Sequence, residues 1–196
     1  MAEHLKPAHE AELVERARSD PAAFQELYHH YLPRVYAYIA ARLPERAEAE
    51  DVVAAAFLEA LERLNQFRAR GAGAFAAWLF RIARHELIDH YRKRRRRDAP
   101  YSLELHCQLV DGAEPLDNAF VREEASAHIR ALVATLPPRR QEVVALRFFA
   151  RLRNNEIAAV LGIQERSVAS HLCRALDDLQ RMLCPNDVTK AKEHSL

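Results

Sequence analysis

Residues 139–183, RRQEVVALRFFARLRNNEIAAVLGIQERSVASHLCRALDDLQRML, contain two helical patterns separated by a glycine. The first pattern ends at Gly162, and glycine readily adopts the left-handed conformation that terminates helices. In the second pattern four apolar side chains recur at helical spacing and are expected to face a core: Val168, Leu172, Leu176 and Leu179. A short helix, a glycine turn and a second helix together predict a helix-turn-helix.

The opposite face of the second predicted helix carries hydrogen-bonding and cationic side chains. They recur at i, i+3, i+4 and i+7: Ser167, Ser170, His171 and Arg174. Helix-turn-helix proteins place such a face in the DNA major groove. The pattern therefore predicts that this part of the chain reads duplex DNA.

The composition of the chain predicts an all-helical fold. Only 4 of the 196 residues are glycine, no stretch alternates with a period of two, and the length suffices for two small domains, each with a modest core. The net charge of +1 hides a run of six cations, 92–97, which favours a polyanionic partner.

Several classes of site and location are not indicated by the sequence. Cys107, Cys173 and Cys184 have no paired spacing, so neither a disulfide framework nor a metal site is indicated, and no cofactor is expected. There is no apolar run of membrane-spanning length and no secretory pattern, which predicts a cytoplasmic protein without membrane insertion.

The chain divides into five segments by its periodicity and its breakers. They are an N-terminal extension (1–19), a first helical domain (20–97), an acidic linker (98–115), a second helical domain (116–184) and a C-terminal tail (185–196). The first domain opens with Asp20 as a helix cap and Pro21 at the first helical position. Pro33 lies within the helical stripe that follows and is expected to kink or break it.

Two further helices are expected in the first domain. A helix over about 47–64 should turn Val53, Phe57, Leu61 and Leu64 inward. The helix that follows should run from about residue 74 into the arginine run, with Phe75, Leu79 and Ile82 inward.

Aromatic and arginine side chains interleave along that last helix, with Phe75 and Trp78 followed by Arg81 and Arg84. Aromatic rings stack on unpaired bases while cations hold phosphate. The alternative for any single aromatic residue is a place in the core, and for the arginine run it is a solvated helix end. Six consecutive cations exceed what a helix end needs, so we favour phosphate contact.

The helix over 47–64 has a small apolar patch opposite its core stripe, formed by Ala54, Ala55 and Leu58 between Asp51 and Glu62. Alanine is a strong helix former, which explains the alanines without any partner. An exposed Leu58 between alanines also suits a protein partner.

One string, His85 to His90, resembles a zinc-binding helix. Such a site needs two histidines four residues apart, so that both imidazoles face one metal. Here Asp89 stands at that position and the second histidine comes one residue later. The spacing does not favour a metal site.

Taken together, these segments resemble a bacterial sigma factor of the sigma-70 class, of the extracytoplasmic-function type. The resemblance rests on five stretches in the expected order and at the expected gap: 23–36, 49–58, 75–92, 136–143 and 156–163. It implies a promoter-specificity factor, with no catalytic activity of its own, that works with core RNA polymerase and promoter DNA. An anti-sigma factor is a further implied partner.

The resemblance also implies a role for particular residues. Core polymerase would be bound by Glu50, Asp51, Ala54, Ala55 and Leu58. The −10 promoter element would be bound by Arg70, Phe75, Trp78, Arg81, Arg84, His85, Arg92, Lys93 and Arg94. The −35 element would be bound by Arg166, Ser167, Ser170, His171 and Arg174.

The chain departs from the family pattern in three places. Ala54 and Ala55 replace a usual Gln-Glu pair, His85 replaces an asparagine, and Ala169 and His171 replace a lysine and an arginine. Fewer cations on the reading helix should weaken phosphate binding and its salt dependence. These departures keep open a second hypothesis, a sigma-like mimic that occupies an anti-sigma factor or polymerase without opening promoters.

Two other hypotheses explain less of the chain. A helix-turn-helix repressor with a helical sensor domain accounts for 139–183 but not for the aromatic and arginine helix. A metalloenzyme would depend on the string at His85 alone.

Overall fold

The computed structural model describes residues 7–43, 45–68, 71, 73–97 and 132–183, and within these ranges it contains helices and no strand. The elements are α1 (Pro7–Arg16), α2 (Pro21–Ala40), α3 (Arg46–Arg63), the 3-10 turn η1 (Leu64–Gln66), α4 (Ala74–Arg97), α6 (Pro138–Phe148), α7 (Asn154–Leu161) and α8 (Glu165–Leu183). The expected linker, Cys107, Arg70 and the tail lie outside the described residues. The all-helical prediction is confirmed.

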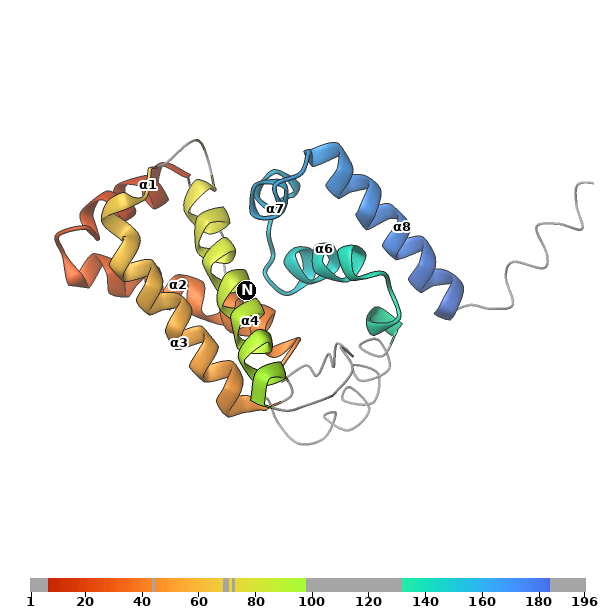
Figure 1. The fold of residues 1–196 in the computed structure, drawn as a ribbon. Coiled ribbons are helices and arrows are strands. Elements are labelled where there is room, and N and C mark those ends of the chain that lie inside the picture. The colour runs from red at the N-terminus through yellow and green to blue at the C-terminus, as the bar shows by residue number, and fades with distance from the viewer. Residues whose placement is uncertain (1–6, 44, 69–70, 72, 98–131, 184–196) are drawn as a thin grey trace, which may run out of the picture.

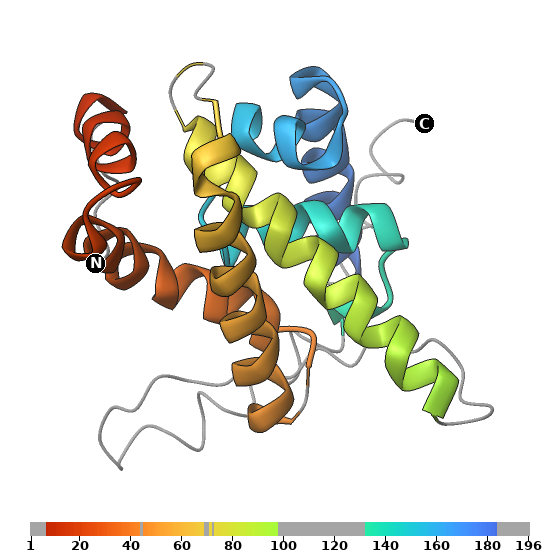
Figure 2. The same cartoon turned by 60° about the vertical axis from the view of Figure 1, so that its left-hand side comes forward.

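The helices form two groups, which we call the N-terminal domain (α1–α4) and the C-terminal domain (α6–α8). Figure 1 shows α4 between them, with α2 and α3 on one side and α6 and α7 on the other. Figure 2 shows the same order from another direction. Helices α3 and α4 pack together, as do α4 and α7. Helix α4 is therefore the element that both domains share.

Helix α2 begins as predicted but does not end where Pro33 suggested. The Asp20 side chain accepts a hydrogen bond from the Ala22 amide at 2.9 Å, and Pro21 occupies the first turn. The helix continues through Pro33 to Ala40, which corrects the expected break. Val35, Tyr38 and Ile39 beyond the proline are fully buried, so tertiary packing outweighs the single lost backbone hydrogen bond.

The N-terminal extension contributes a helix that the sequence analysis did not predict. Leu13, Val14 and Ala17 are buried, and α1 packs against α2. The Tyr31 hydroxyl donates a hydrogen bond to the buried Glu10 carboxylate at 2.5 Å. The N-terminal domain therefore begins before residue 20.

Two leucines expected in the core are largely exposed. Leu61 on α3 is 47% exposed, and Leu176 on α8 is also 47% exposed. Both are members of correct helical stripes, but their helices contact neighbours over a narrower arc than the stripe covers. The other inward predictions for α3 are confirmed, since Val53, Phe57 and Leu64 are buried.

The cores of the two domains are continuous, which differs from the expectation of two separate modest cores. Tyr38 and Phe80 from the N-terminal domain belong to the same buried cluster as Leu146, Leu152 and Ile157 from the C-terminal domain. All of these side chains are fully buried. Burial in each domain therefore depends on the presence of the other.

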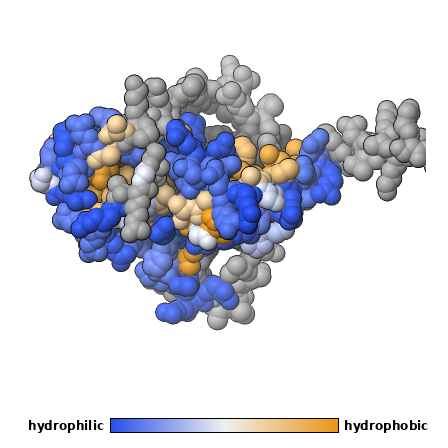
Figure 3. All heavy atoms as spheres, turned by 90° about the horizontal axis from the view of Figure 1, so that it is seen from above, coloured by the Kyte–Doolittle hydropathy of each residue, from blue (hydrophilic) through white to orange (hydrophobic). Residues whose placement is uncertain are grey.

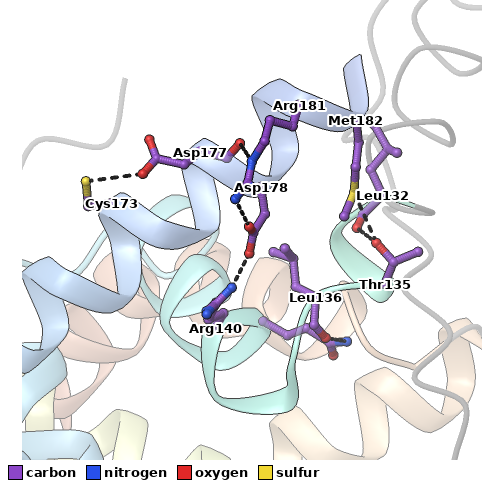
Figure 4. Close-up of polar contacts among 10 residues, drawn as sticks. Leu132, Thr135, Leu136, Arg140, Cys173, Asp177, Asp178, Arg181 and Met182 are labelled. Atoms are coloured by element: carbon purple, nitrogen blue, oxygen red, sulfur yellow. Dashed lines mark hydrogen bonds and ion pairs between the residues drawn. The ribbon is translucent and has the colours of Figure 1, made fainter. Parts of the chain in front are cut away.

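A smaller second cluster holds the far side of the C-terminal domain, where Val133, Leu136 and Val144 pack against Ala175. Polar contacts frame it, as Figure 4 shows: Arg140 pairs with Asp178, and Arg181 pairs with the same carboxylate at 2.6 Å. These contacts fix the register of α8 along α6.

The surface seen in Figure 3 is mainly hydrophilic, with apolar residues in small patches. Across the described ranges, no helix combines the length and the apolar character that crossing a membrane requires.

Candidate nucleic-acid interface

The aromatic side chains at the start of α4 belong mostly to the core. Phe75 is buried, and its ring packs against those of Tyr31, Phe67 and Trp78, with centroids 5.4–5.7 Å apart. Trp78 is half-buried at the edge of this cluster. For Phe75 the structure therefore supports the core alternative, and Trp78 is the aromatic ring of the pair that reaches the surface.

Arg81 and Arg84 lie one turn apart on α4, and both meet the C-terminal domain. Arg81 Nη2 donates a hydrogen bond to the Ala159 carbonyl oxygen at 2.7 Å. Arg84 Nε lies 3.4 Å from Glu142 Oε1. In this conformation the acceptors of these two cations are protein groups rather than phosphate.

The C-terminal half of α4 carries the exposed cations. Arg92 pairs with Asp89 at 3.0 Å and Arg94 pairs with Glu48 at 3.0 Å, while Lys93 is exposed. Exposed ion pairs of this kind contribute little to stability and exchange readily for other anions. This end of α4 therefore remains available to a polyanion.

His85 is exposed on α4, between two acidic neighbours. Its Nδ1 lies 3.8 Å from Glu86 and its Nε2 lies 3.7 Å from Asp89. The structure also brings Glu59 of α3 next to this group, which sequence spacing had not indicated. Burial and a hydrogen bond with Glu59 raise the pKa of Glu86. His90 instead faces Glu48 at 3.4 Å, so the two histidines of the string do not converge.

The helix-turn-helix forms as predicted. Helix α7 ends at Gly162, whose φ of +64° places it in the left-handed region, and α8 begins three residues later at Glu165. The Glu156 side chain accepts a hydrogen bond from the Arg153 amide at 2.7 Å, which caps the start of α7.

The reading face of α8 points away from the core. Arg166 and Arg174 are exposed, whereas Ser167, Ser170 and His171 are half-buried. Burial, together with the guanidinium groups of three arginines, holds the pKa of His171 below its ordinary value; these are Arg139, Arg174 and Arg140. The five predicted residues therefore share one surface.

Arg139 is a member of this surface that sequence reasoning missed. Its Nη2 donates to the Leu161 carbonyl oxygen at 3.4 Å, across the turn of the helix-turn-helix. The residue lies at the start of α6, 32 positions before His171, so helical periodicity within α8 gives no sign of it.

The predicted polymerase-binding face of α3 is open. Asp51 and Ala54 are exposed, Leu58 is 58% exposed, and Ala55 is half-buried. Glu50 pairs with Arg46 on the same face at 2.7 Å. The face is formed by one helix and is not covered by the C-terminal domain.

Comparisons with known proteins agree with this arrangement. Residues 27–97 match the family model of sigma-70 region 2, and residues 127–179 match that of sigma-70 region 4. The chain belongs to the sigma-70 family of RNA polymerase sigma factors. The helix-turn-helix lies within the region 4 match, and α3 and α4 lie within the region 2 match.

Similar proteins place the chain in the extracytoplasmic-function group. It is 35% identical to the ECF RNA polymerase sigma factor BldN of Streptomyces coelicolor, covering 94% of this chain and 71% of that one. It is 30% identical to the RNA polymerase sigma-H factor of Pseudomonas aeruginosa, covering 92% and 97%. SigW, an ECF sigma factor of Bacillus subtilis, is 29% identical over 85% and 91% of the two chains.

Solved structures share the fold. CnrH in complex with the cytosolic domain of CnrY aligns with a TM-score of 0.64 at 23% identity, covering 90% of this chain and 97% of that one. RpoE from Bartonella quintana in complex with the anti-sigma factor NepR aligns with the same TM-score at 22% identity, covering 83% and 98%.

Proposed function

We propose that this sigma factor directs core RNA polymerase to promoters by using three separate faces. The exposed face of α3 binds polymerase, α4 binds the −10 element, and α8 binds the −35 element. The observation that carries the proposal is the match to both sigma-70 regions in one chain, with the helix-turn-helix reading face exposed. A repressor requires the second region alone.

The chemistry of each face suits its assignment. On α8, Arg166 and Arg174 are positioned to contact phosphate or guanine, and Ser167 and Ser170 add hydrogen bonds at base edges. On α4, Trp78 offers a ring edge for stacking beside Arg81 and the exposed Lys93. In this proposal the sigma factor itself catalyses no bond formation, because polymerase supplies the chemistry.

The proposal is tested by transcription from a random promoter library with core polymerase and this chain. We expect a set of promoters that core polymerase alone does not use, sharing two sequence elements. If no promoter is enriched, the proposal is wrong.

A second candidate, the sigma-like mimic, is favoured by Ala54 and Ala55 on the open face of α3. In this hypothesis the chain binds an anti-sigma factor tightly and opens no promoter. Binding of core polymerase by the wild type and by an Ala54→Gln/Ala55→Glu variant separates the two. Tight binding by the wild type supports the sigma factor, and binding by the variant alone supports the mimic. The matched control is Asp177→Asn, on the exposed side of α8.

A further inference from the structure

Four arginines of the N-terminal domain converge on the surface that the C-terminal domain covers. We call Arg34, Arg42, Arg81 and Arg84 the cationic surface. Arg34 and Arg42 come from α2 and the turn after it, and Arg81 and Arg84 come from α4. Arg34 is 5% exposed and Arg42 is 3% exposed, which is rare for a charged side chain.

Each member of the cationic surface meets an acceptor from the C-terminal domain. Arg34 Nε donates to the Ala150 carbonyl oxygen at 2.9 Å, and Arg81 Nη2 donates to the Ala159 carbonyl oxygen at 2.7 Å. Arg42 Nη2 donates to Glu142 Oε2 at 2.9 Å. A buried guanidinium requires such partners, because leaving it unpaired away from water is costly.

Glu142 is the central acceptor. Its carboxylate pairs with Arg42 and with Arg84, and it accepts a hydrogen bond from the buried Tyr38 hydroxyl at 2.7 Å. The Arg42 guanidinium also stacks on the Tyr38 ring, 4.2 Å from its centroid. One carboxylate of the C-terminal domain thus neutralises two cations of the N-terminal domain, as one phosphate group of a nucleic acid would.

A second close approach occurs where α7 meets the start of α4. A Cβ added to Gly73 would lie 2.2 Å from Glu156 Oε1, so only glycine leaves room for this carboxylate. Glu156 is buried in this contact. The segment that leads into α4 is therefore also covered by the C-terminal domain.

The face of α3 predicted to bind polymerase is not affected by this contact. Asp51, Ala54 and Leu58 stay exposed while the cationic surface is covered. Polymerase can therefore dock on a chain whose α4 surface is still closed.

We propose that the cationic surface is a single-stranded DNA site, and that Glu142 and the carbonyl oxygens of α6–α7 occupy it in the free chain in place of DNA phosphates. Arg34 and Arg42 are then phosphate-binding residues in addition to those on α4. The C-terminal domain and the DNA strand compete for the same cations. This inference rests on the proposed function for its DNA ligand, but closure of the free chain is measurable without polymerase.

The first test measures closure by energy transfer between dyes on the full-length chain. One dye is placed on a cysteine introduced by Glu12→Cys on the exposed side of α1, and the other on the exposed native Cys173, with Cys107 and Cys184 changed to serine. We expect high transfer in the wild type and lower transfer in Glu142→Gln, which removes the charge but keeps the shape. Tyr38→Phe should lower transfer less, and Asp177→Asn, which removes a charge elsewhere on the C-terminal domain, should leave it unchanged. Equal transfer in wild type and Glu142→Gln would overturn the clasp.

The second test measures binding of a fluorescent, random-sequence, single-stranded 20-mer. We expect Glu142→Gln to bind about tenfold more tightly than wild type, which corresponds to about 1.4 kcal/mol. Asp177→Asn controls for the general loss of negative charge and should bind like the wild type. Unchanged binding in Glu142→Gln would contradict the competition.

The third test separates a phosphate contact from a merely structural role of Arg42. Combined with Glu142→Gln, Arg42→Gln should weaken binding of the 20-mer and lower the slope of log affinity against log salt by about 0.7. A structural role alone predicts no loss of affinity in this opened background. If polymerase fails to bind or to transcribe while these results hold, the proposed function fails and the cationic surface stands.

Discussion

The two DNA-facing helices of this sigma factor are in opposite states. On α8, Arg166 and Arg174 are exposed and the reading face is open, whereas on α4, Arg81 and Arg84 are engaged by the C-terminal domain. The two helices have similar sequence signals, with cations at helical spacing. The difference shows that a reading face is defined by what packs on it as well as by its residues. In this conformation the −35 face is ready for DNA and the −10 face is not.

The largest expected effect comes from loosening the core beneath α4. Phe80→Ala should lower the free energy of unfolding by about 4 kcal/mol, since the fully buried ring leaves a cavity in the shared core. Chemical denaturation checks this with two probes, fluorescence of Trp78 in the N-terminal domain and a dye on Cys173 in the C-terminal domain.

Because the cores are continuous, both probes should report a lower transition midpoint for Phe80→Ala. A control, Leu176→Ala, removes a largely exposed side chain and should shift neither probe appreciably. If the Cys173 probe is unmoved by Phe80→Ala, the two domains do not share stability, and the contrast between α4 and α8 loses its structural cause.

The next effect concerns duplex binding by the free chain. Arg174→Ala should reduce affinity for a −35 duplex about tenfold, because an arginine contact to phosphate or base contributes about 1–3 kcal/mol. Arg81→Ala should leave this affinity unchanged, because its guanidinium is covered. Fluorescence anisotropy with a selected promoter duplex measures both, and equal losses in the two variants would contradict the contrast.

A smaller effect concerns pH. The pKa of His171 is lowered in the free chain by burial and by Arg139, Arg174 and Arg140, so the imidazole is neutral at pH 7. DNA phosphates beside it raise this pKa, so that binding takes up a proton and affinity increases as pH falls. We expect about a threefold gain between pH 7.5 and 6, at constant salt, on the scale of about 1.4 kcal/mol per tenfold change.

His171→Gln provides the control for this pH effect, since it keeps a polar side chain that does not titrate. It should remove most of the pH dependence of duplex binding. A variant with the same pH profile as wild type would assign the proton uptake to another group.

The smallest expected effect is on stability at Glu86. Folding raises the pKa of this carboxyl group through burial and its contact with Glu59. The folded chain therefore holds the proton more tightly than the unfolded chain, and stability falls as pH rises from the unfolded pKa through the folded one. Glu86→Gln should stabilise the chain by about 0.5 kcal/mol at pH 7 and not at about pH 4. Thermal unfolding at the two pH values measures this, with Glu62→Gln on the exposed side of α3 as control; a gain that is the same at both pH values would contradict the role of the charge.

Most helices and the helix-turn-helix were predictable, because they depend on local signals. The Asp20 cap, the glycine at 162 and the apolar spacing of α4 act over a few residues, and the structure contains each of them. The errors occurred where a helix meets a distant partner. Leu61 and Leu176 follow the stripes of their helices but find no neighbour, whereas α2 continues through Pro33 because the residues beyond it are buried.

The sites divide in the same way. The residues expected on α3 and α8 share exposed faces because one helix presents them, and single-helix geometry follows directly from spacing. Arg34 and Glu142 carried no such signal. They act across separations of more than a hundred residues, as in the hydrogen bond from Arg34 to Ala150 and the one from Tyr38 to Glu142.

The sequence by itself determined the helices, the order of the two sigma regions and the identity of the reading face on α8. All of these depend on periodicity, caps and side-chain type within one helix. Only the tertiary structure decided that the two cores merge, that Phe75 lies in the core and that Glu142 neutralises Arg42 and Arg84. The physical reason is that burial and charge pairing depend on which distant surfaces meet, and no local pattern encodes that meeting.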